Sequence, residues 1–157
     1  MGKKTNKQAV GDVVRIPLAE GRHGYALALV PPLFAFFDCL GGDELAPADV
    51  ISRPVLFRLW VMDSAVTSGR WPIVGRVEPP PALLAAATFF KQNALNKRKL
   101  TIYVGGKESP ATREQCVGLE RAAVWDPAHV EDRLTDHHAG RPNKWVESLR
   151  LEDSLEE

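Results

Sequence analysis

The sequence has few of the residues that mark a secreted or a nucleic-acid-binding protein. Only two of its 157 residues are cysteines, which excludes a disulfide framework and a cysteine-based metal site. Cys39 and Cys116 both lie beside apolar residues, and this predicts buried free thiols in a reducing compartment. The 20 basic residues are balanced by 20 acidic ones, and this balance counts against a nucleic-acid partner.

Long hydrophobic runs are also missing. The longest uncharged stretch, residues 24–37, is too short to span a bilayer and is interrupted by Pro31 and Pro32. The lysines near the N-terminus are not followed by the apolar segment of a signal peptide. We therefore expect a cytoplasmic protein without a membrane partner.

What the sequence does contain is typical of a globular protein. Apolar residues make up 45% and charged residues 25% of the chain, which excludes wholesale disorder. At this length we expect one domain over residues 10–150, between a flexible N-terminus (residues 1–9) and a frayed acidic tail (residues 151–157).

Strand patterns dominate the first two thirds of the chain. Short apolar runs between glycine or proline turns predict strands over residues 12–18, 25–30, 55–63, 70–77, 100–104 and 122–125, with a further apolar strand that ends at residue 37. In the run 55–63, Phe57 and Leu59 point to the same side and are expected to face the core. Residues 82–87 favour a helix, and Phe89 and Phe90 either end it or begin a strand.

The best-marked helix lies near the C-terminus. Asp126 is a good N-cap, proline follows at the first helical position and Gly140 is a stop signal, so a helix is predicted over residues 127–139. Val130 and Leu134 lie one turn apart on its inward side. With a second short helix after residue 142, the pattern predicts an α+β fold. In this fold a bent antiparallel β-sheet or partial small barrel of about five to seven strands carries C-terminal helices packed against it.

No catalytic motif is present. The sequence has no nucleophile elbow, no phosphate-binding glycine loop followed by lysine and no HExxH zinc motif. His137 and His138 are neighbours, but adjacent side chains point about 100° apart on a helix, and no third ligand has the right spacing. We therefore expect no metal and no cofactor.

One alternative function is that of a small hydrolase. Asp38 and Asp63 lie at predicted strand ends, and paired carboxylates carry out acid–base chemistry in such enzymes. Cys116 is a candidate nucleophile, although no glycine elbow or helix start lies beside it to lower its pKa. This alternative requires a deep pocket that contains these groups.

An acidic stretch follows the first group of strands. Residues 38–49 contain no basic residue and four acidic ones, namely Asp38, Asp43, Glu44 and Asp49. These side chains either form a solvated loop or present an acidic surface to a basic partner.

A second candidate contact site surrounds the turn after residue 62. Trp71 lies between Arg70 and a proline in this turn, where we expect it to be partly exposed. Tryptophan and arginine are frequent at protein interfaces, so Asp63, Arg70 and Trp71 form a candidate partner site. The alternative is structural: Trp71 covers the core, and Arg70 pairs with Asp63.

A second alternative function is nucleic-acid binding by a small barrel. Its candidate residues are a basic cluster and a nearby tyrosine: Lys91, Lys97, Arg98, Lys99 and Tyr103. Binding driven by phosphate contacts falls steeply with salt, and this would distinguish it from protein recognition.

Several segments, taken in their order, resemble a known family. They are GDVVRIPL, GYALAL, LFAFFD, PVLFRLWVMD, GRWPIVG, FFKQ, LTIY and AVWDPAHVEDRL, spread from about Val10 to Leu149. This set is similar to the immunity protein 26 family of bacterial polymorphic toxin systems. The resemblance implies a cytosolic antidote with a compact β-rich fold, which binds and neutralises a cognate toxin domain without catalysis. It assigns no catalytic residues, and it leaves the contact face and the oligomeric state open.

Overall fold

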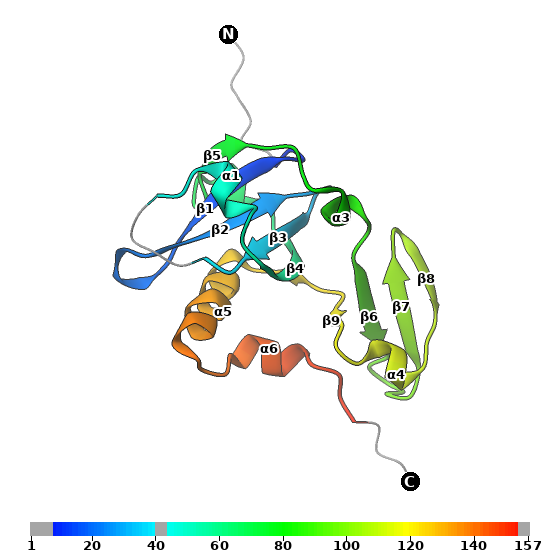
Figure 1. Cartoon of the computed structure of the whole chain (residues 1–157). Helices are drawn as coiled ribbons and strands as arrows, with labels where there is room; N and C mark the ends of the chain where they lie inside the picture. Colours follow the sequence, from blue (N-terminus) through cyan, green and yellow to red (C-terminus); the bar gives the residue numbers. More distant parts are fainter. Residues whose placement is uncertain (1–7, 40–43, 154–157) are drawn as a thin grey trace. The chain divides into compact units, whose positions relative to one another are not determined.

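The computed structural model describes residues 8–39 and 44–153, and the chain divides into two compact units (Figure 1). Residues 1–84 and 124–143 belong to the first unit, and residues 85–123 and 144–157 belong to the second. Most of the predicted flexible N-terminus and acidic tail lies outside the described residues. The expectation of one domain over residues 10–150 stays a prediction.

A six-stranded sheet forms the body of the first unit. Its strand order is β10-β4-β3-β2-β1-β5, and neighbouring strands are antiparallel except for the pair β10 and β4. The strands are β1 (Asp12–Pro17), β2 (His23–Ala28), β3 (Leu33–Phe37), β4 (Val55–Val61), β5 (Ile73–Arg76) and β10 (Val124–Trp125). The helical segments are the 3-10 turn η1 (Ala19–Gly21), α1 (Pro47–Val50), α2 (Ser64–Thr67), α3 (Pro81–Leu84) and α5 (Pro127–Ala139).

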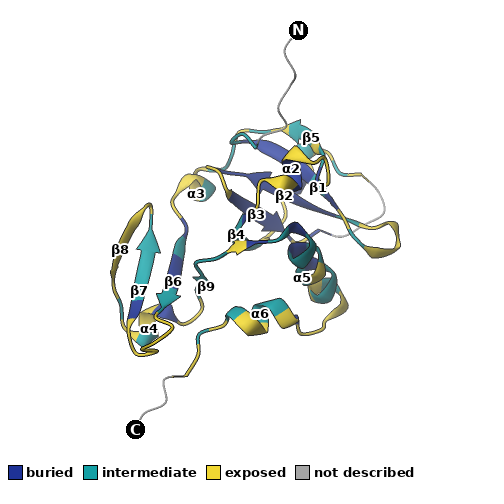
Figure 2. Cartoon of the chain, turned by 180° about the vertical axis from the view of Figure 1, so that it is seen from behind, coloured by how far each residue is buried: buried dark blue, intermediate teal, exposed yellow. Residues whose placement is uncertain are grey.

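Both faces of the central strands are buried, and the aromatic part of the core lies on one of these faces. Phe34 and Phe36 of β3 pair with Leu59 and Phe57 of β4, so these four side chains point to the same side. Trp71 packs edge-on against Phe34 and Phe36, with ring centroids 5.8 and 5.9 Å apart. Figure 2 shows the central strands β2 and β3 as buried along most of their length. Large rings bury much apolar area, so this aromatic face contributes strongly to the stability of the unit.

Helix α5 covers the aromatic face. Its N-cap Asp126 accepts a hydrogen bond from a backbone N–H of the first turn, and its C-cap Gly140 has the left-handed φ of 71° that ends many helices. Val130 and Leu134 are fully buried. Leu134 packs so closely on β2 that a β-carbon at Gly24 would lie 3.2 Å from its Cδ1 atom. The bounds of this helix and its inward side are therefore those predicted from the sequence.

The other face of the sheet carries residues 44–50, which include α1. Tyr25 points to this face because it follows Gly24 in β2, and its hydroxyl accepts a 3.0 Å hydrogen bond from the Leu45 backbone N–H. Pro47 lies so close to Gly75 of β5 that a β-carbon there would overlap it. Contacts with two strands therefore fix this segment on the sheet.

A four-stranded sheet forms the second unit. Its strand order is β8-β7-β6-β9, with β9 parallel to β6 and the other pairs antiparallel. Its elements are β6 (Thr88–Gln92), β7 (Leu100–Val104), β8 (Lys107–Pro110), α4 (Arg113–Cys116), β9 (Glu120–Arg121) and α6 (Lys144–Leu149). Phe90, Leu100 and Cys116 form a buried cluster. Thr112 and Gln115 close a capping box at the start of α4, which stabilises this short helix.

The predicted α+β class is confirmed, and both predicted C-terminal helices are present as α5 and α6. The strands are divided between two sheets, each sheet has one parallel pair at its edge, and neither closes into a barrel. Phe89 and Phe90 belong to strand β6 and not to a helix. Within residues 8–39 and 44–153, no helix has the length and hydropathy needed to cross a membrane.

The expectation that Trp71 is partly exposed is wrong. Its side chain is fully buried, and its indole N–H donates a 2.9 Å hydrogen bond to Glu131 of α5. Arg70 donates two hydrogen bonds of 2.7 and 2.8 Å to the same carboxylate, where the structural interpretation expected Asp63 as its partner. A buried indole needs an acceptor for its N–H, and α5 supplies one from a position 60 residues away.

Replacing Leu134 tests the packing of α5 on the sheet. Because Leu134 is fully buried, we expect Leu134→Ala to lower the free energy of unfolding by about 2–5 kcal/mol. Leu95 is 98% exposed, so Leu95→Ala, the same chemical change, should shift this free energy by less than about 0.5 kcal/mol. Urea titration followed by circular dichroism measures both values, and equal losses for the two variants would contradict the prediction.

Replacing Glu131 tests whether its carboxylate is needed to bury Trp71. Glu131→Ala leaves the indole N–H without its acceptor, and we expect the free energy of unfolding to fall by about 1–3 kcal/mol. Arg70→Ala removes a partner whose side chain is 47% exposed, and it should cost about 0–1 kcal/mol. Glu131→Gln keeps an acceptor oxygen and should give an intermediate stability. In the same urea titration, an equal cost for Arg70→Ala and Glu131→Ala would argue against this role.

Candidate functional site

Most of the residues predicted as partner contacts lie on the surface of the first unit. The exposed acidic ones are Asp38, Glu44, Asp49 and Asp63. Arg70 is also exposed, Trp71 is buried, and Asp43 lies outside the described residues. Acidic groups are therefore accessible to a basic partner, whereas Trp71 is not accessible for contact.

Glu44 and Asp49 lie on the segment that is fixed on the sheet. Glu44 forms an ion pair of 3.2 Å with Arg15 of β1, and its side chain remains 76% exposed. A hollow of about 330 Å³ lies beside this pair, and Arg15, Tyr25 and Glu44 supply its ionisable lining. Because Arg15 neutralises part of the charge on Glu44, the acidic stretch is not a uniformly negative loop.

Asp63 and Arg70 lie before and after helix α2. Asp63 is the N-cap residue of α2, but its side chain makes no capping hydrogen bond and is exposed at the end of β4. Arg70 is bound to Glu131, so its positive charge is already paired within the unit. Of the three residues predicted to form this site, Asp63 and Arg70 therefore lie on the surface and Trp71 lies in the core.

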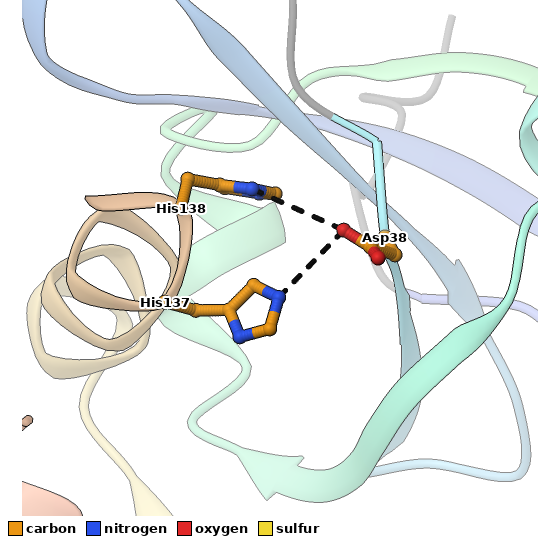
Figure 3. A group of neighbouring side chains, drawn as sticks. All are labelled: Asp38, His137 and His138. Atoms are coloured by element: carbon orange, nitrogen blue, oxygen red, sulfur yellow. Dashed lines mark ion pairs between the residues drawn. The ribbon is translucent and has the colours of Figure 1, made fainter. Parts of the chain in front are cut away.

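The structure also brings Asp38 together with the neighbouring histidines His137 and His138. Asp38 directly follows β3, and its backbone N–H donates a 2.8 Å hydrogen bond to the carbonyl of Pro54. His137 and His138 lie in the last turn of α5. Figure 3 shows both imidazoles directed at one carboxylate oxygen of Asp38, with His137 Nε2 at 3.7 Å and His138 Nδ1 at 4.0 Å. We call these three residues the Asp38–His cluster.

The two histidines of the Asp38–His cluster have different surroundings. The side chain of His138 is 10% exposed, whereas that of His137 is 44% exposed. Burial lowers the pKa of His138, His137 lowers it further, and Asp38 raises it by a smaller amount. The net effect favours a neutral imidazole at His138 near pH 7.

Two periodicities in the sequence point to this cluster. His138 lies four residues after Leu134, so it continues the buried stripe of α5. Asp38 lies two residues after Phe36, so it continues the aromatic face that α5 covers. Adjacent histidines on a helix point in different directions, and the sequence showed no third group between them that would complete a metal site. The structure places Asp38 in that position.

The paired carboxylates of the hydrolase alternative lie far apart. Asp38 is bonded to Pro54, which precedes β4, and Asp63 lies beyond the opposite end of β4. The stretch from residue 54 to residue 63 corresponds to about 25–30 Å of extended chain. Carboxylates that act together in glycosidases are about 5–10 Å apart, so these two aspartates do not form a catalytic pair.

Cys116 lacks the surroundings of a catalytic nucleophile. Its side chain is 1% exposed and packs with Phe90 and Leu100. Burial raises the pKa of its thiol, against a smaller lowering by Arg113, so the unreactive protonated form is favoured. Cys39 is also buried, and burial raises its pKa to about 11. The prediction of buried free thiols is confirmed for both cysteines.

The basic cluster of the nucleic-acid alternative is partly paired within the second unit. Lys91 forms an ion pair of 3.1 Å with Glu108, and its ammonium group lies 4.7 Å from the centroid of the Tyr103 ring. Lys97 forms an ion pair of 2.6 Å with Glu152. These contacts neutralise positive charge that phosphate binding would require.

The comparisons with known proteins identify one family. The family described as immunity protein 26 matches residues 9–101, which contain β1 to β6 and the start of β7. No curated protein and no solved structure matches the chain. The matched segment covers more than half of the chain and includes Asp38, and it ends before α5 with its two histidines. The chain therefore belongs to the immunity protein 26 family.

Proposed function

We propose that this protein is the antidote of a bacterial polymorphic toxin system, which binds a cognate toxin domain in the cytoplasm and neutralises it by one-to-one contact. The observation that carries the proposal is the family match over residues 9–101. Immunity proteins are generally not enzymes, so neutralisation requires one antidote molecule for each toxin molecule. The rate and strength of binding, and not a chemical step, then determine protection.

The surface of the first unit supports recognition of a basic partner. We place the contact on residues 44–50, where Glu44 and Asp49 are exposed. Contacts with Tyr25 and Gly75 within the same unit hold this segment on the sheet. A rigid segment loses little conformational entropy when it binds, so more of the contact energy remains as affinity.

Acidic side chains on this segment suit a toxin that acts on nucleic acid. The active site of such a toxin is basic because it binds phosphate groups. Carboxylates placed in that site compete with the phosphates, speed the encounter and disfavour partners that carry negative charge. The other exposed acids among the predicted partner contacts are Asp38 and Asp63; they lie at opposite ends of β4 and are not part of the proposed contact.

Titration of the toxin with its antidote tests the one-to-one mechanism. The toxin domain used is the one encoded next to this protein, at a concentration well above the dissociation constant. We expect toxin activity to fall linearly and to vanish at about one molar equivalent, because each bound antidote blocks one toxin molecule. Complete neutralisation by a small fraction of an equivalent would require turnover and would contradict the proposal.

Charge reversal at Asp49 tests the proposed contact segment. We expect Asp49→Lys to lower the association rate constant about 10-fold at low salt, because a lysine there repels a basic toxin. Glu114→Lys makes the same change in net charge at an exposed position of α4 and should change this rate constant less than about 2-fold. Surface plasmon resonance at low and high salt measures both variants. Equal effects of the two substitutions would exclude residues 44–50 as the contact.

A further inference from the structure

Three side chains of the kinds that bind metals converge where β3 and α5 end. One donor atom from each of Asp38, His137 and His138 lies within 4.8 Å of the other two. The aspartate follows β3 and the histidines end α5, so two elements far apart in the sequence of the first unit supply the donors. Both imidazole nitrogens are directed at the same carboxylate oxygen, as Figure 3 shows.

The distances in this cluster fit ligands around an ion better than they fit hydrogen bonds. His137 Nε2 and His138 Nδ1 lie 3.7 and 4.0 Å from Asp38 Oδ1. Hydrogen bonds between nitrogen and oxygen are about 2.7–3.2 Å long. Two ligands of a tetrahedral zinc ion, each about 2.0–2.1 Å from the metal, are about 3.3 Å apart. Small rotations of the exposed side chains of Asp38 and His137 would therefore bring all three donors onto one ion.

We propose that Asp38, His137 and His138 bind one divalent transition-metal ion of the zinc class. Two imidazole nitrogens and one carboxylate oxygen suit Zn²⁺, Co²⁺ and Ni²⁺, whereas Mg²⁺ and Ca²⁺ take mainly oxygen ligands. Three protein ligands leave a coordination position for water, and Asp38 and His137, which are 46% and 44% exposed, open the cluster to solvent.

Two features limit the affinity of this site. Arg22 lies close enough to lower the pKa of His138, and Arg53 lies close enough to act in the same way on Cys39, which follows Asp38 in the chain. This positive charge opposes the binding of a cation. A metal on Nδ1 of His138 leaves the proton on Nε2, which is buried and has no hydrogen-bond partner among the described residues. We therefore expect micromolar binding, weaker than that of closed structural zinc sites with four protein ligands.

A bound ion would connect the sheet to its covering helix. Asp38 lies within the segment that matches the immunity protein family, and the two histidines lie outside it. The proposed site thus joins the family segment to α5, and its test does not rest on the proposed function. Binding to the folded state alone would stabilise the first unit.

Isothermal titration of the full-length, tag-free, chelator-treated protein with ZnCl₂ tests the proposal. We expect one Zn²⁺ per chain and no measurable binding of Mg²⁺. Asp38→Asn and His137→Ala change exposed side chains that a fold tolerates well, and each should weaken Zn²⁺ binding at least about 10-fold. His129→Ala changes a histidine of the same helix outside the cluster and should leave the Zn²⁺ affinity unchanged.

Thermal unfolding provides a second readout. At a free Zn²⁺ concentration about 100 times the dissociation constant, the Tm of the unchanged protein and of His129→Ala should rise by about 5–10 °C. Under the same conditions the Tm values of Asp38→Asn and His137→Ala should rise by no more than about half as much, because a 10-fold loss of affinity halves the stabilisation. Absence of Zn²⁺ binding, or equal affinity in Asp38→Asn and His129→Ala, would overturn the proposal.

Discussion

The structure of the first unit depends on the packing of α5 against the aromatic face of the six-stranded sheet. Leu134 approaches the backbone of β2 at Gly24, where the sheet has no side chain to keep the helix away. The Arg133 guanidinium lies 3.7 Å from the ring centroid of Phe57, so a charged side chain also contributes to the packing. Glu131 of the same helix accepts the indole N–H of Trp71, and a tryptophan is thereby buried without an unpaired polar group.

The same packing determines what α5 presents at its C-terminal end. Asp136 accepts hydrogen bonds from Asn143 at 2.9 Å and from Arg141 at 3.0 and 3.1 Å, and these bonds hold the pKa of Asp136 below its usual value. They fix the chain that leaves the helix against its last turn. His137 and His138 therefore lie on a helical turn that is bonded to the segment following it, and this bonding helps to fix their direction toward Asp38.

Features of the fold that depend on residues close together in the sequence could be predicted. Features that depend on contacts between residues far apart in the sequence could not. Helix α5 was predicted with its correct bounds because a cap, a proline and a glycine mark its ends within a few residues. The sequence left open whether Trp71 is partly exposed or covers the core, because the acceptor that allows its burial lies 60 residues away. The Asp38–His cluster was missed because strand and helix periodicity assign a residue to a face and do not identify what covers that face. For the same reason, strand patterns did not reveal that the strands form two sheets.

The proposed toxin contact and the Asp38–His cluster lie on opposite faces of one sheet. Tyr25 holds residues 44–50 on one face, and the neighbouring Gly24 is in contact with α5 on the other. Glu44 and Asp49 are thus separated from the two histidines by the thickness of a packed sheet. A metal ion in the cluster would therefore not touch a toxin bound at residues 44–50, and its effect would be on the stability of the unit that both faces share.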